Sequence, residues 1–113
     1  MTKIKFFKIN ENFVGIECSG HTDYAEFNKD ILCASLSGIV QSGILGLTKV
    51  LKIDGKLTRK DKNGYIKFEL PVDLEENKLT CSQIIFKTMY ESILDLQSGY
   101  SQYISMEVID DVY

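Results

Sequence analysis

The longest apolar segment of the chain covers residues 31–51 and restricts the folds that the chain can adopt. Asp30 precedes it and is a good residue to cap the first turn of a helix. Asp54-Gly55 follows it and supplies a stop signal. We therefore predict a long helix from Asp30 to about Lys52. Its apolar residues do not fit one stripe, which is typical of a helix that is buried on several sides. They are Ile31, Leu32, Ile39, Val40, Ile44, Leu45, Leu47, Val50 and Leu51.

Small residues recur at every fourth position of the same segment. Ala34, Gly38, Ser42 and Gly46 would lie on one face of the helix, where another element can approach closely. Two interpretations remain open at this point. The face packs tightly on the protein's own sheet, or it forms a subunit interface.

Two pairs of segments have the pattern of β-hairpins. Residues 3–9 and 13–18 are rich in β-forming side chains and flank the turn-like residues 10–12. Val14, Ile16 and Cys18 are expected to share one face of the second strand. Residues 57–62 and 65–70 flank Asn63-Gly64, a strong hairpin signal.

A second helix is expected to be capped by Asn77 or Thr80 and to end near Gly99. Its predicted apolar stripe consists of Cys81, Ile85, Met89, Ile93 and Leu96. Alternation at residues 104–108 predicts a last strand. The order is therefore ββαββαβ, and we expect a single α+β domain over residues 1–113, with two helices packed on a mainly antiparallel sheet.

Charge and cysteine content restrict the partners and the cellular location that we expect for this protein. Thirteen basic and sixteen acidic residues give a formal net charge of −3, so we expect no direct nucleic-acid partner. The three cysteines are an odd number, and Lys3, Lys5 and Lys8 interrupt the opening segment, which does not resemble a signal peptide. We expect free thiols in the cytoplasm. No run approaches the roughly 18 uninterrupted apolar residues of a membrane span, so no membrane is expected.

The residues with the clearest chemical potential lie between the first hairpin and the long helix. His21 is the only histidine, and Cys33 follows it by twelve residues. With Asp30 as the helix cap, Cys33 lies in the first turn, where unpaired amides and the helix dipole favour a thiolate. His21 can then act as base and later as acid. Asp30 is a candidate to orient His21, and Ser37 shares the helix face of Cys33.

Two other interpretations compete with catalysis. A cysteine on an apolar helix is often a buried packing residue. Alternatively, Cys18-x-x-His21 together with Cys33 and Cys81 supplies four possible zinc ligands. However, Cys18 and Cys81 both fall on predicted core faces, and no zinc-type pair spacing repeats. We therefore expect neither a metal nor a cofactor.

The same stretch resembles the signature of the ribosomal-processing cysteine protease family, called Prp. The resemblance rests on Gly20-His21, Tyr24-Ala25, the run Asp30-Ile31-Leu32-Cys33-Ala34, and Ser37. Length and element order extend it over nearly the whole chain. Departures from the family pattern are Thr22 for the usual Ala, Asn28 for a Gly, and Leu32, Ser35 and Leu36 for Val, Ala and Val.

The resemblance implies a homodimeric cysteine endopeptidase. Such an enzyme removes an N-terminal extension from a large-subunit ribosomal protein precursor and cleaves after an aromatic residue. Carried over to this sequence, the family pattern implies that Cys33 is the nucleophile and His21 the base. Gly20, Asp30 and Ser37 would support them. Residues 22–29 would form a loop over the bound peptide. The alternative function is a non-catalytic ribosome-associated binding module.

Overall fold

The computed structural model describes residues 1–20, 31–60 and 64–111. The strands are β1 (Thr2–Ile9), β2 (Asn12–Ser19), β3 (Lys56–Lys60), β4 (Tyr65–Glu69) and β5 (Ile104–Asp110). The helices are α1 (Ile31–Leu45), continued by the π-helical segment η2 (Gly46–Val50), and α2 (Glu76–Gly99). The predicted ββαββαβ order is confirmed.

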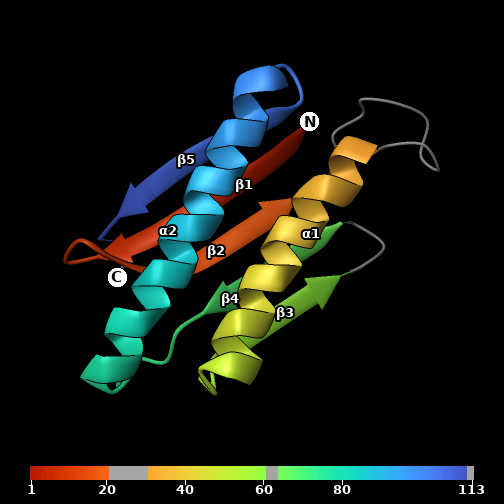
Figure 1. The fold of residues 1–113 in the computed structure, drawn as a ribbon. Coiled ribbons are helices and arrows are strands. Elements are labelled where there is room, and N and C mark those ends of the chain that lie inside the picture. The colour runs from red at the N-terminus through yellow and green to blue at the C-terminus, as the bar shows by residue number, and fades with distance from the viewer. Residues whose placement is uncertain (21–30, 61–63, 112–113) are drawn as a thin grey trace.

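The strands form one five-stranded sheet in the order β3-β4-β2-β1-β5. All neighbours are antiparallel except β1 and β5, so the sheet is mainly antiparallel, as predicted. Both helices lie on the same face of the sheet (Figure 1). The start of β1, the end of β2 and the start of α1 lie at the same end of the molecule (Figure 1).

The strand register places side chains in rows that cross the sheet. One helix-facing row consists of Leu57, Phe68, Ile16, Phe6 and Val108. The next row consists of Arg59, Ile66, Cys18, Ile4 and Met106. On the opposite face, Lys5, Glu17 and Lys67 lie in register on β1, β2 and β4, an alternation of charge that favours the pairing. One face is therefore mainly apolar and covered by helices, and the other carries these charged side chains, with Lys67 over the Phe7 ring.

A β-bulge changes the predicted face of β2. The register shifts between Phe7 and Lys8, so that Phe13, rather than Val14, is buried in the core. The Phe13 ring stacks on Phe86 of α2, with ring centroids 6.0 Å apart. Val14 itself is only partly buried, because an extra residue in β2 interrupts the alternation on which the prediction rests.

Gln83 of α2 holds the start of β2 through buried hydrogen bonds. Its Nε2 donates to the Phe13 carbonyl at 2.8 Å, and its Oε1 accepts from the Phe13 amide at 2.7 Å. Buried main-chain groups that a bulge leaves outside the ladder need such partners. A polar side chain at a core position of α2 is thereby explained.

The long apolar helix is buried on one side only. Its buried stripe is Leu32, Leu36, Val40, Ile44 and Leu47. Ile31 and Leu45, by contrast, are 70% and 54% exposed. The expectation of burial on several sides is wrong for the described chain, because the sheet and α2 cover only one stripe. The helix ends in η2, and Lys52 follows with a left-handed φ of 55°.

The small-residue face of α1 is mostly exposed. Ala34, Gly38 and Ser42 are exposed, and only Gly46 approaches another element, the Ile85 side chain of α2. The interpretation that this face packs on the protein's own sheet is therefore wrong for those three residues. The subunit-interface interpretation is the one that the exposed face leaves open.

Helix α2 begins at Glu76 with Glu75 as its N-cap, two residues before the earlier of the two predicted caps, Asn77. Its buried residues are Ser82, Gln83, Phe86, Met89 and Ile93. Cys81 is exposed, so its predicted place in the core is wrong. The actual stripe includes Phe86, the larger apolar side chain, and this rotates Cys81 toward solvent.

Residues Ile31–Val50 form a 20-residue helix that is long and apolar enough to cross a membrane by length and composition. The core helix of a globular protein passes the same test. Here the stripe from Leu32 to Leu47 packs in the core, and the exposed side also carries Gln41 and Lys49. This segment is therefore explained by its packing on the sheet.

Two glycines of α1 test the one-sided burial of the helix. A Cβ added at Gly43 would collide with the Met89 side chain, whereas one added at Gly38 would have no neighbouring atom within 4 Å. We expect Gly43→Ala to destabilise the fold by about 1–3 kcal/mol through overpacking. Gly38→Ala should stabilise it by about 1 kcal/mol through helix propensity.

Urea denaturation of both variants at one protein concentration measures this difference. Equal free energies of unfolding for the two variants would contradict the described contact between α1 and α2.

Candidate active site

A cavity of about 210 Å³ opens between the start of α1, the end of β2 and the start of β4. Residues from five elements and the segments next to them line it. They are Thr2, Cys18, Gly20, Cys33, Leu36, Ser37, Val40, Gln41, Arg59, Gly64, Tyr65 and Ile66. The cavity lies over the sheet row of Arg59, Ile66 and Cys18, at the end of the molecule where β2 stops and α1 begins.

Cys33 is the third residue of α1 and is half-buried in the cavity wall. The buried anchors Leu32 and Leu36 fix the rotation of the helix, and Cys33 follows the first of them directly. The first-turn amides of a helix lack main-chain partners and favour negative charge. The first turn of α1, from Ile31 on, carries no acidic side chain. The predicted place of Cys33 in the first turn is confirmed.

A second thiol, that of Cys18, lines the same cavity from β2. Burial raises the pKa of Cys18 to about 12, and negative charge on Cys33 and Glu17 adds to the shift. The Cys18 thiol therefore stays neutral at physiological pH. Of the two thiols, Cys18 is the structural one.

Ser37 reaches the cavity one helical turn beyond Cys33. Its Oγ accepts a hydrogen bond from Gln41 Nε2 at 2.6 Å. The two side chains form a polar pair on an otherwise mainly apolar wall. Sequence reasoning identified Ser37 but missed Gln41, although the spacing of four residues on a helix was the available signal.

Gly20 lies where the chain leaves β2 and enters the cavity wall. Its φ is +89°, a region that residues with a Cβ rarely adopt. A Cβ at this position would also lie 2.8 Å from the Met1 carbonyl oxygen. Glycine is therefore required for the close approach of the two strand ends immediately before His21.

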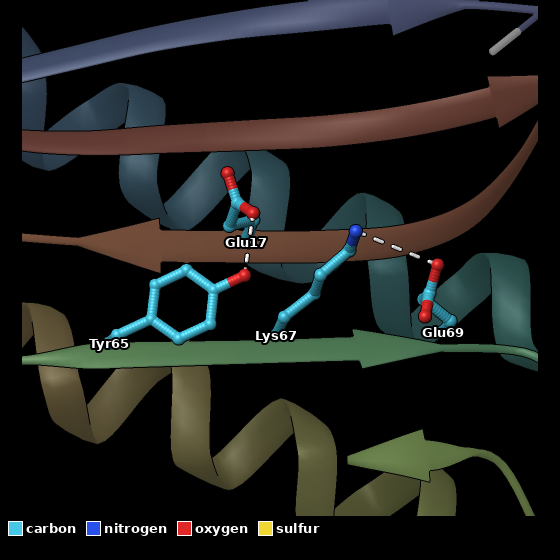
Figure 2. A network of polar contacts seen from close by, with 4 residues as sticks. All are labelled: Glu17, Tyr65, Lys67 and Glu69. Atoms are coloured by element: carbon cyan, nitrogen blue, oxygen red, sulfur yellow. Dashed lines mark hydrogen bonds and ion pairs between the residues drawn. The ribbon is translucent and has the colours of Figure 1, made fainter. Parts of the chain in front are cut away.

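Polar contacts on the open face of the sheet fix the Tyr65 side chain. Tyr65 donates its hydroxyl proton to Glu17 Oε2 at 2.7 Å, and Lys67 lies 3.7 Å from Glu69 (Figure 2). The hydrogen bond to Glu17 is the main cause that raises the pKa of Tyr65 to about 12. Tyr65 therefore keeps its proton at neutral pH and is unsuited as a base.

The structure brings three of the predicted site residues together, since Gly20, Cys33 and Ser37 line one cavity. His21, Asp30 and the loop 22–29 lie outside the described residues. Sequence reasoning did not place Thr2 or Arg59 at the site, because both are brought there by strand pairing rather than by local spacing.

The zinc interpretation required four ligands at one place. Cys81 lies on α2, is exposed, and does not line the cavity that Cys18 and Cys33 share. Within residues 1–20, 31–60 and 64–111, no three His, Cys, Asp or Glu side chains gather in an arrangement that could hold a metal ion.

A family model described as cysteine protease Prp matches residues 1–105. The chain belongs to this family. It is a cysteine protease, and the family resemblance drawn from the sequence is confirmed.

A curated relative, the ribosomal processing cysteine protease Prp of Bacillus subtilis (strain 168), is 22% identical over 91 residues. That match covers 80% of this chain and 81% of the relative.

Two solved structures have a TM-score of 0.84 and 20% identity to this chain. One is SMU.848 from Streptococcus mutans, for which the match covers 98% of this chain and 96% of that one. The other is the essential ribosomal processing protease Prp from S. aureus with a covalently linked product peptide, with 96% and 99% covered. The S. aureus protease with a substrate peptide has a TM-score of 0.79 at 17% identity, with the same coverage. These likenesses establish the fold.

The protonation of Cys18 leads to a labelling prediction. Relative to the ordinary thiol pKa of 9.0, a pKa of about 12 lowers the thiolate fraction by roughly a thousandfold. We expect iodoacetamide at neutral pH to modify exposed Cys81 readily in the folded protein and to leave Cys18 unmodified. In urea both should react. Peptide mapping by mass spectrometry measures each site, and Cys18 labelling as fast as Cys81 in the folded protein would contradict the assignment.

Proposed function

We propose that this protease removes the N-terminal extension of a large-subunit ribosomal protein precursor and cleaves after an aromatic residue. The observation that carries the proposal is the half-buried Cys33 in the first turn of α1, beside a cavity, in a chain of the Prp family. The S. aureus relative with a substrate peptide supports a peptide as the substrate. A net charge of −3 is compatible with a basic ribosomal protein.

The proposed reaction is acyl transfer. The Cys33 thiolate attacks the scissile carbonyl carbon and forms a C–S bond. Amide N–H groups at the start of α1 stabilise the oxyanion that develops on the carbonyl oxygen. His21 gives a proton to the departing amine as the C–N bond breaks. Water then attacks the thioester, releases the acyl fragment as a carboxylate, and restores Cys33.

The remaining residues have supporting roles in this proposal. Gly20 permits the strand end that leads into His21, and its positive φ supports this role. Ser37, paired with Gln41, presents a polar group to the bound peptide. Asp30 is proposed to cap α1 or to orient His21.

Membership of a protease family favours this enzyme over the non-catalytic binding module. The odd number of cysteines supports a cytoplasmic location.

Loss of either proposed catalytic side chain should stop the reaction. We expect Cys33→Ala to lower kcat/KM by at least about a thousandfold, because it removes the nucleophile. His21→Ala should lower it by about a hundredfold or more, because proton transfer is lost. The substrate is a peptide that joins an aromatic-containing extension to a basic segment, and cleavage is followed by mass spectrometry. Cys81→Ala, on the exposed face of α2, is the matched control and should retain activity.

Unimpaired cleavage by Cys33→Ala or by His21→Ala would rule out the proposed Cys-His mechanism. Cleavage by the wild type at a bond that does not follow an aromatic residue would rule out the proposed specificity alone.

We further propose that the enzyme is a homodimer that uses the small-residue face of α1. Ala34, Gly38 and Ser42 leave the helix backbone exposed, with Ile31 and Leu45 on the same side. Small residues let two helices approach closely, and exposed large apolar side chains favour burial against a partner. Such a face on a helix of the catalytic cavity would place the two sites near the interface.

A bulky charge should disrupt this interface. We expect light scattering to give twice 12.8 kDa for the wild type and 12.8 kDa for Ser42→Arg. Thr88→Arg, at an exposed position of α2, is the control and should stay dimeric. A wild-type mass of 12.8 kDa at micromolar concentration would disprove the dimer, and a dimeric Ser42→Arg variant would disprove the interface.

A further inference from the structure

A second and larger cavity, of about 640 Å³, lies at the opposite end of the strands from Cys33. The end of β2 and the start of β4 contribute to the cavity beside Cys33, whereas the start of β2 and the end of β4 contribute to this second cavity. Its volume is in the range of roughly 300–1,000 Å³ that is typical of binding sites. The wall is mainly apolar, and its aliphatic residues are Ile9, Val14, Leu70, Val72, Leu74 and Leu79.

Val72, at the edge of the second cavity, is an apolar residue that the fold does not bury. It lies between β4 and α2, lines the cavity and is fully exposed. Leu70 and Leu74 on either side of it pack against the core, but Val72 does not. An exposed apolar side chain beside an apolar cavity is typical of an interaction site, because a bound partner removes both surfaces from water.

The rim of the second cavity is acidic. Glu11 and Asp73 each lie between two residues of the cavity wall in the sequence, and both are exposed. Asp111 Oδ1 accepts a hydrogen bond from the main-chain amide of Asn10, another wall residue, at 3.3 Å. Lys56 of the wall lies opposite a carboxylate of β4 in the strand register. The three rim carboxylates are therefore in excess over basic charge, which favours a positively charged partner.

The two cavities are separated along β4. Ile66 lines the cavity beside Cys33, and Leu70 lines the second cavity. Four residues of extended chain span about 14 Å, at about 3.4 Å per residue. The side chains next to the cleaved bond therefore do not reach the second cavity, whereas a segment that begins several residues away from that bond can reach it.

We propose that the second cavity is an exosite that binds a basic segment of the protein substrate, remote from the cleaved bond, by one large apolar side chain flanked by lysine or arginine. The inference rests on the proposed function, because it takes the basic mature part of the precursor as the source of that segment. The apolar side chain enters the cavity beside Val72, and the flanking cations lie near Glu11 and Asp73. Such binding stabilises the enzyme–substrate complex and the transition state equally, so it lowers KM rather than raising kcat.

Reversal of the rim charge tests the electrostatic part of the proposal. The variant combines Glu11→Lys with Asp73→Lys, at two exposed positions. The long substrate joins the aromatic-containing extension to the basic segment, and the short substrate ends two residues after the cleaved bond. We expect the ratio of kcat/KM for the long substrate to kcat/KM for the short one to fall about tenfold in the variant, through KM. The matched control, Glu91→Lys with Asp95→Lys on the exposed side of α2, should leave the ratio unchanged.

Removal of the apolar edge tests the other part of the proposal. Val72→Ser should lower the same ratio about fivefold, because it removes apolar surface from the contact with the substrate. Ile84→Ser, at an exposed position of α2, is the control and should not change the ratio. Both side chains are mostly in solvent, so neither substitution removes a core contact. An unchanged ratio in the charge-reversed variant or in Val72→Ser overturns the proposal.

A binding measurement separates this inference from the proposed function. A fluorescent peptide with one leucine flanked by lysines is titrated into Cys33→Ala, with the native rim or with Glu11→Lys and Asp73→Lys added, and anisotropy gives Kd. We expect about tenfold weaker binding to the reversed rim, and also for a peptide in which alanine replaces the leucine. If the wild type cleaves neither substrate, the proposed function fails, and these Kd values still decide the exosite. Equal Kd values overturn it.

Light scattering examines the alternative occupant of the second cavity, a second copy of the chain. We expect Val72→Ser to have the same mass as the wild type. A variant with half the mass of a wild-type dimer would mean that a partner subunit covers the cavity, and would overturn the exosite.

Discussion

The position of Cys33, the proposed nucleophile, depends on the packing of one helical stripe against one face of the sheet. Leu32, Leu36 and Val40 of α1 are buried against the helix-facing rows of β2 and β4. Because these residues recur every four positions, they fix both the rotation of α1 and its height above the sheet. Cys33 follows the first of them and is thereby held beside the cavity at the end of β2. The position of Cys33 and the burial of the helix are set by the same contacts, so changes in this stripe would affect both.

Buried polar groups in this fold are of two kinds. Gln83 satisfies both main-chain groups of Phe13 and so makes the bulge in β2 compatible with a core position. Thr2, by contrast, has no partner for its hydroxyl within the described chain. The Gln83 bonds stabilise the irregular start of β2, whereas the unpaired Thr2 hydroxyl contributes no such bond and lowers the stability of the fold.

Much of the fold could be predicted because its signals are local. Alternation and turn residues predicted the strands, and the signals at Asp30 and Gly55 predicted the two ends of the long helix closely. It was harder to predict which face each helix turns toward the core. α1 is apolar nearly all round, so periodicity did not separate the buried stripe from the exposed face with Ile31 and Leu45. The bulge was not predictable from β2 alone, because it depends on Gln83, seventy residues away. Thr2 and Cys18 joined the site through strand pairing, which a single sequence does not display.

The two thiols that line the cavity differ in their surroundings, because one lies within the sheet and the other at the start of a helix. Cys18 sits within a sheet row between Ile4 and Ile66, where burial keeps its thiol neutral. Cys33 sits at the first turn of α1, where unpaired amides favour an anion and the turn from Ile31 on adds no acidic side chain. Because burial keeps the Cys18 thiol neutral, it adds no negative charge beside Cys33. The neutral thiol also adds an apolar surface to the cavity wall. A buried, neutral thiol is unsuited as a nucleophile, so Cys18 is a structural part of the cavity.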